Sequence, residues 1–171
     1  MKKLLILFLL SFLLLFEGCG YRPNAKFSRE VVGEKISTNV IISQQDPDNS
    51  VIIKDAVDTA VIEVFKASLV SQENADTHLT ISVSNPQYRP VVYDEHGYVV
   101  GYRMKVDLYI KRETKNKSLK NYVTHGQYDF SIEAQSIITD QQRYESINVA
   151  AQRAIRAFLA QVSAEGARVK E

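Results

Sequence analysis

The sequence is poor in the residues from which common catalytic and metal sites are built. It holds one cysteine, Cys19, and three histidines, which lie far apart with no HxH or HExxH spacing: His78, His96 and His125. A zinc site needs several such ligands at short spacings, so we expect no metal site and interpret the histidines as surface residues. There is also no G-x-S-x-G elbow and no glycine-rich phosphate loop. We therefore expect no cofactor.

Only one pair of carboxylates could be considered as a catalytic site. Asp94 and Glu95 are adjacent, within a stretch that ends in Gly97 and separates two strand-like segments. Adjacent acids in such a position usually serve turn formation and solubility. With the sole thiol assigned elsewhere, as argued below, the sequence predicts a protein that is not an enzyme.

An excess of one charge is also missing. The chain has 21 basic and 20 acidic residues, and removal of Lys2, Lys3 and Glu17 with the leader described next makes the two numbers equal. A nucleic-acid-binding domain needs a basic excess to displace counterions from phosphates. We therefore expect no nucleic-acid partner.

The first residues form a leader. Lys2 and Lys3 precede an apolar run from Leu4 to Phe16. A membrane-spanning helix needs about 20 apolar residues, and this run is shorter. A basic start followed by a short apolar region is typical of a secretory signal peptide.

The end of the leader resembles a lipobox. The only cysteine follows Gly18, the place where signal peptidase II cuts before a cysteine whose thiol is acylated. Phe16 and Glu17 depart from the usual leucine and small residue, and an ordinary signal peptide that ends near a cysteine is the alternative. The pattern predicts a signal peptide over residues 1–18 and lipidation at Cys19.

Acylation of Cys19 would determine the compartment and the source of stability. Two or more acyl chains give a stable anchor, so the mature protein would be tethered to a membrane and face the periplasm. No disulfide could then form, and stability must come from packing. Gly20 follows the cysteine, in place of the aspartate that retains many lipoproteins at the inner membrane. We therefore expect the outer membrane.

Hydrophobic periodicity predicts one domain over residues 36–165. Residues 19–35 are polar and form the lipidated N-terminus and tether, and residues 166–171 form a tail. Alternating apolar positions predict four strands, and three- and four-residue steps predict two amphipathic helices. The expected strands cover 36–42, 79–83, 98–110 and 122–132, and the expected helices cover 51–70 and a segment from an Asp140 cap to just before Gly166.

The order of these elements is β-α-β-β-β-α. Pro86 and Pro90 disrupt the stretch before the hairpin, so an edge or bulged strand is expected there. Because each strand has one apolar face, the sequence predicts an α+β two-layer sandwich with both helices on one face of a four-stranded sheet. The other sheet face, which includes Arg103, Lys105 and His125, should be polar and either simply solvated or a docking surface.

Three segments together resemble the LptE family of LPS-assembly lipoproteins. They are Gly18-Cys19-Gly20-Tyr21-Arg22-Pro23, the strand Tyr102-Arg103-Met104-Lys105-Val106-Asp107-Leu108, and Ala150-Ala151-Gln152-Arg153-Ala154 in the last helix. The resemblance covers the whole mature chain and depends on order and pattern. It implies a plug inside the outer-membrane β-barrel LptD that helps assemble the barrel and deliver lipopolysaccharide to the surface.

The resemblance also directs attention to basic residues near the hairpin. Family members bind lipopolysaccharide through cations at the hairpin tip, but here the tip reads Asp94-Glu95-His96-Gly97. Arg89, Arg103 and Lys105 are the nearby cations that could take this role. The alternative function is an auxiliary lipoprotein of an ABC-type lipid transport system, whose members share small α/β domains and Cys-Gly starts.

Overall fold

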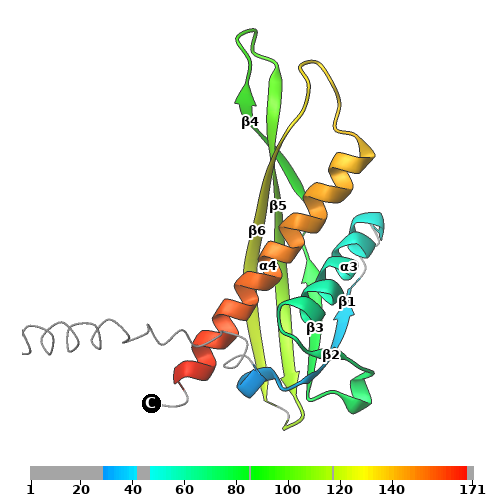
Figure 1. Ribbon diagram of the computed structural model, residues 1–171, viewed down its shortest axis with the longest axis vertical. Coiled ribbons are helices and arrows are strands. Elements are labelled where there is room, and N and C mark those ends of the chain that lie inside the picture. Colours follow the sequence, from blue (N-terminus) through cyan, green and yellow to red (C-terminus); the bar gives the residue numbers. More distant parts are fainter. Residues whose placement is uncertain (1–28, 42–46, 85, 117, 169–171) are drawn as a thin grey trace, which may run out of the picture.

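The computed structural model describes residues 29–41, 47–84, 86–116 and 118–168 (Figure 1). The predicted signal peptide and Cys19 lie outside these segments. The described residues begin with one helical turn at residues 29–32. The elements that follow are β1 (Lys35–Val40), α3 (Pro47–Glu63), β2 (Ser68–Leu69), the 3-10 helix η1 (Gln72–Asn74), β3 (Thr77–Val83), β4 (Gln87–Tyr93), β5 (Val99–Thr114), β6 (Leu119–Ser131) and α4 (Asp140–Arg168).

The long strand β5 organises the sheet. β3 and β4 follow one another along one side of β5, and β6 pairs with its other side; all three pairings are antiparallel. β1 lies beyond β3 and is parallel both to β3 and to β2. The β4–β5 hairpin extends past the helices at the upper end of the molecule, whereas α4 ends at the lower end (Figure 1).

Both helices pack on the same face of the sheet, as the sequence predicted (Figure 1). The strand side chains that face them are buried and apolar, among them Leu79, Ile81, Met104, Val106, Leu108 and Ile110. The helix α4 crosses β6 so closely that a Cβ on Gly126 would lie 1.7 Å from the carbonyl oxygen of Ala150. A side chain at this position would push the helix off the sheet.

The described segments hold six strands, and a short helix at residues 29–32 precedes α3 and α4, so the expectation of four strands and two helices was wrong. β4 forms in spite of Pro90, because it pairs on only one side and shifts register around this residue. This confirms the predicted edge or bulged strand. β2 has only two residues and carries no periodic signal.

The expected bounds of the first helix, 51–70, were also wrong. α3 starts at Pro47, which suits the first helical position because proline lacks the N–H that would be unpaired there. The helix ends at Glu63, and wider backbone hydrogen bonds than those of a regular α-helix close its last turn. The Ala67 N–H donates to the Val61 carbonyl at 3.4 Å, and Lys66 adopts a left-handed backbone with φ of 52°. The chain can therefore turn back and add β2 beside β1.

The cap of the last helix differs from the expected Asp140. Thr139 Oγ1 accepts a hydrogen bond from the Gln142 N–H at 3.3 Å, and Gln142 Oε1 accepts one from the Thr139 N–H at 3.0 Å. This reciprocal pair is a capping box. The helix also continues through Gly166 to Arg168 instead of ending before the glycine. Glycine costs about 1 kcal/mol in a helix, and contacts of Glu165 described below offset that cost.

Candidate functional site

The sheet face turned away from the helices carries a cluster of charged residues. Because side chains alternate along a strand, every second residue of β5 and its partner on β6 point to this outer face. The register aligns three polar pairs there: Arg103 with Asp129, Lys105 with Gln127, and Asp107 with His125. We refer to these six residues, together with Gln87 and Arg89 on β4, as the outer charged face.

Arg103 and Asp129 form a bidentate pair. Arg103 Nε donates to Asp129 Oδ1 at 2.7 Å, and Nη2 donates to Oδ2 at 2.8 Å. The hydrogen bonds from Arg103 lower the pKa of Asp129 below its ordinary value, since they favour the charged carboxylate. Both side chains remain about half exposed. The pair is therefore accessible to a partner molecule.

Asp107 links two further groups on this face. Its carboxylate accepts a hydrogen bond from Lys105 Nζ at 3.0 Å and lies 2.6 Å from His125 Nδ1. Burial acts to raise the pKa of Asp107, but the hydrogen bonds from Lys105 and His125 outweigh it and the net shift is downward. The carboxylate therefore stays charged and holds both neighbours in place.

The three cations that the sequence singled out lie together on the outer charged face. Arg89 stands directly opposite Arg103, and Lys105 is two residues further along the same strand. Arg89 Nη2 donates to Gln87 Oε1 at 3.1 Å. Within the part of the chain that the structure describes, Arg89 has no carboxylate partner, unlike Arg103 and Lys105. Their binding role stays a prediction.

The lower part of the same sheet face is less polar than expected. Tyr109 on β5 lies opposite Val123 on β6, and both are about half exposed. Leu119 at the start of β6 is also exposed. Large apolar side chains that neighbour one another on an uncovered face are typical of a contact surface. The outer face thus combines charged and apolar parts.

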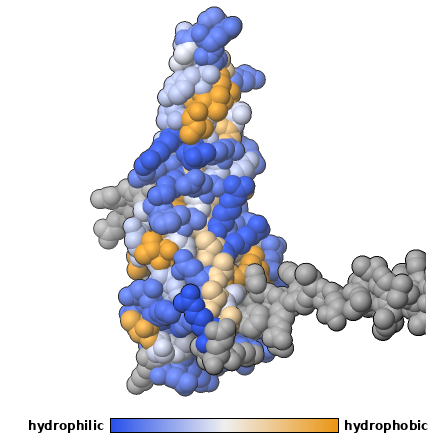
Figure 2. Space-filling view, turned by 90° about the vertical axis from the view of Figure 1, so that its left-hand side faces the viewer, coloured by the Kyte–Doolittle hydropathy of each residue, from blue (hydrophilic) through white to orange (hydrophobic). Residues whose placement is uncertain are grey.

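The hairpin tip is built by Asp94. Its Oδ1 accepts the backbone N–H groups of His96 at 3.0 Å and Tyr98 at 2.8 Å, and Gly97 has φ of 82°. The predicted turn role of Asp94 is thus confirmed. The hairpin also exposes Val92 and Tyr93, and Figure 2 shows apolar surface near this upper end.

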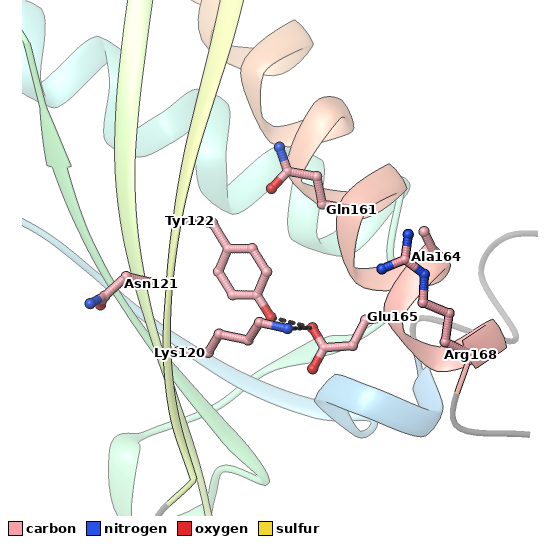
Figure 3. Close-up of a pocket in the computed structure, with 7 residues that line it drawn as sticks. All are labelled: Lys120, Asn121, Tyr122, Gln161, Ala164, Glu165 and Arg168. Carbon is pink, nitrogen blue, oxygen red and sulfur yellow. Dashed lines mark hydrogen bonds and ion pairs between the residues drawn. The ribbon is translucent and has the colours of Figure 1, made fainter.

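A second charged cluster, which the sequence analysis missed, lies on the helix-covered side near the end of α4 (Figure 3). Its centre is Glu165, which bonds Arg112 Nη2 at 3.0 Å, the Tyr122 hydroxyl at 2.6 Å and Lys120 Nζ at 3.0 Å. The side chain of Arg112 is only 4% exposed. We call these four residues the Glu165 cluster.

The Glu165 cluster holds its carboxylate in the charged form. Burial acts to raise the pKa of Glu165, but hydrogen bonds from Tyr122, Lys120 and Arg112 outweigh it and lower the pKa to about 2. Burial, and then the bond to Glu165, raise the pKa of the Tyr122 hydroxyl. Two sequence signals could have revealed the pair. Arg112 continues the apolar face of β5 after Ile110, and Glu165 lies two helical turns beyond Phe158.

The described residues offer little for other chemistry. No group of three or more histidine, cysteine, aspartate or glutamate side chains among them could hold a metal ion. No helix in these segments is long and apolar enough to cross a membrane.

Solved structures with the same fold include two bacterial lipoproteins. A candidate lipoprotein of Caulobacter crescentus CB15 superposes with a TM-score of 0.57 at 14% identity, covering 88% of this chain and 99% of its own. A minor lipoprotein of Acinetobacter baumannii gives 0.50 at 11% identity, covering 79% and 94%. A Xanthomonas campestris protein gives 0.51 at 9% identity, covering 80% and 87%. At these identities the likeness concerns the fold alone.

The sequence comparison identifies the family. No curated protein is similar to the chain in sequence. The family model of LptE, described as lipopolysaccharide-assembly, matches residues 37–162, which run from β1 into α4 and include both charged clusters except Glu165. The resemblance found in the sequence is thus confirmed. The chain belongs to the LptE lipopolysaccharide-assembly family.

Proposed function

We propose that the protein is a lipid-anchored outer-membrane plug and assembly factor of the lipopolysaccharide translocon. It binds the LptD barrel and holds lipopolysaccharide during delivery to the cell surface, as a non-enzymatic component. The family match over residues 37–162 is the observation that carries this proposal. The outer sheet face supports it, because the two α-helices α3 and α4 lie on the opposite side of the sheet (Figure 1).

The composition of the outer face suits a protein partner together with an anionic ligand. Arg103–Asp129 and Lys105–Asp107 present both signs of charge, which set register and encounter rate at protein interfaces. Arg89 offers a guanidinium that no described carboxylate neutralises, and guanidinium binds phosphate groups well. We therefore assign the paired charges to the barrel and Arg89 to lipopolysaccharide.

Affinity purification of the tagged lipoprotein tests the partner. We expect a large outer-membrane β-barrel to copurify with it. Recovery of an inner-membrane transporter as the only partner would contradict this proposal and support the auxiliary subunit of an ABC-type lipid transport system. Arg89→Gln should weaken lipopolysaccharide binding without reducing barrel recovery, and Lys111→Gln on the same sheet face is the matched control.

Fractionation of cells tests the anchor. Because acylation needs the thiol of Cys19, Cys19→Ala should leave an unprocessed or unanchored chain that incorporates no labelled fatty acid. A variant that still carries fatty acid in the outer membrane would disprove the lipobox assignment. Cys19→Ala concerns only the anchor, so its outcome is independent of the barrel test.

A further inference from the structure

A cleft of about 550 Å³ opens at the lower end of the molecule, between the start of β6 and the last turns of α4 (Figure 3). Its volume lies in the range of small-molecule sites. Six of the seven residues that line it carry a polar side-chain group: Lys120, Asn121, Tyr122, Gln161, Glu165 and Arg168, with Ala164 as the seventh. The cleft lies beside α4, whereas Arg89, Arg103 and Lys105 lie on the outer sheet face.

The charges around this cleft do not cancel. Lys120 and Arg168 line it, and Arg112 stands behind it, against the single carboxylate of Glu165. Arg112 is bound to Glu165 through two nitrogens and offsets its charge. The end of α4 adds roughly half a negative charge. An excess of more than one positive charge remains, so the cleft favours an anion.

The donors of the cleft suit phosphate oxygens. Lys120 Nζ gives one bond to Glu165 and keeps two N–H groups, and its side chain is about half exposed. Arg168 is exposed and forms no ion pair within the described residues. In Figure 3 its guanidinium and the Gln161 amide lie on the helix side of the cleft, across from Lys120. A lysine and an arginine on opposite walls can both donate hydrogen bonds to one phosphate group.

The cleft also lies at the end from which the chain would reach a membrane. The described residues begin at Arg29, in the helical turn near the last turns of α4 (Figures 1 and 3). Nine residues lie between Cys19 and Arg29, and the ten residue steps that join them span at most about 35 Å when fully extended. An acylated Cys19 would therefore keep this end near the leaflet, where anionic headgroups attract basic residues.

We propose that this cleft binds the phosphate of an anionic phospholipid headgroup in the leaflet that holds the lipid anchor. Lys120 and Arg168 contact the phosphate oxygens, and Gln161 offers an amide donor at its edge. Glu165 and Arg112 fix the position of Lys120 from behind. The proposal uses the proposed acylation only for proximity to the membrane, and it does not depend on barrel binding or on the lipopolysaccharide role of Arg89.

The test measures lipid adducts on the intact lipoprotein. The mature protein in neutral detergent micelles is titrated with phosphatidylglycerol or phosphatidylcholine, and bound lipid is counted by native mass spectrometry. We expect phosphatidylglycerol to bind at least tenfold more tightly, because the choline ammonium offsets the charge of the other phosphate. Lys120→Gln with Arg168→Gln should abolish that preference. Lys111→Gln with Arg156→Gln removes two exposed cations from β5 and α4 and should leave it within twofold.

Three results would overturn the proposal. They are equal binding of the two lipids, an unchanged preference in the Lys120/Arg168 double variant, or displacement of phosphatidylglycerol by inorganic phosphate at equal concentration, which would make the site one for free phosphate. Lipopolysaccharide binding is measured on the same double variant and should persist. Loss of lipopolysaccharide binding in this double variant would contradict the assignment of lipopolysaccharide to Arg89 in the proposed function.

Discussion

Two arginines of β5 each pair with a carboxylate, but one pair is exposed to solvent and the other is largely buried. Arg103 bonds Asp129 on the outer sheet face, where its side chain is 44% exposed. Arg112 bonds Glu165 beneath α4, where its side chain is 4% exposed. The nine-residue separation puts them on opposite faces, because side chains alternate along β5.

The contrast separates stability from binding. Water and salt screen the exposed Arg103–Asp129 pair, so it stabilises the fold little and remains open to a partner. The Glu165 cluster has lost much of its solvent, and removal of one member leaves the others without full compensation. We therefore expect changes on the helix-covered face to alter the unfolding free energy and changes on the outer face to alter association.

The largest contrast should come from Phe158 and Lys111. Phe158 is fully buried and packs against Tyr122 at 5.0 Å between ring centroids. Phe158→Ala should lower the unfolding free energy by about 3 to 5 kcal/mol, because it leaves a cavity. Lys111→Ala on the exposed face should change it by less than about 0.5 kcal/mol. Equal urea midpoints for the two variants would contradict the assignment of faces.

Removal of Arg112 should come next in size. Arg112→Met keeps most of the buried side-chain volume but leaves Glu165 with only Tyr122 and Lys120. Breaking a buried ion pair costs about 3 to 5 kcal/mol, and the remaining donors place this loss near the lower end. Arg103→Met serves as the control in the same urea titration. If both substitutions destabilise equally, burial does not distinguish the two pairs.

Acid should weaken the fold through Glu165. Its pKa is about 2 in the folded protein against an ordinary value of 4.5. Because the folded pKa is the lower one, this stabilisation is present above pH 4.5 and is lost as the pH falls toward 2. Between pH 6 and pH 3 the group should lose about 2 kcal/mol. Glu165→Gln should reduce the difference between urea unfolding at the two pH values by this amount; an unchanged difference would refute the low pKa.

The sheet faces could be predicted from sequence, but several element boundaries could not. The alternation of apolar and polar residues from Tyr98 to Ile110 predicts which side of β5 is buried. The structure confirms this prediction from Met104 onward. The end of α3 depends on Lys66 in a left-handed conformation, which usually marks glycine, so no residue signalled it. β2 exists only because the chain reverses there and meets β1.

The candidate site was likewise only partly predictable from the sequence. Alternation places Arg103 and Lys105 on one face, but their partners depend on the register between β5 and β6, which the sequence does not state. Arg112 was missed because a charged residue after a run of apolar positions usually indicates that the buried part of a strand has ended. Its partner Glu165 is 53 residues away on a helix that was expected to end there.

The most direct test that the outer charged face serves binding compares two charge-reversal variants. Arg103→Glu with Lys105→Glu changes the outer charged face, and Lys54→Glu with Arg156→Glu changes exposed cations on the two helices. Barrel recovery in affinity purification and urea unfolding are measured for both. We predict at least a tenfold loss of recovery for the outer-face variant alone, because like charges across an interface repel, with the urea midpoint nearly unchanged. Full recovery by the outer-face variant, or an equal loss in both, would contradict the assignment of binding to the outer face.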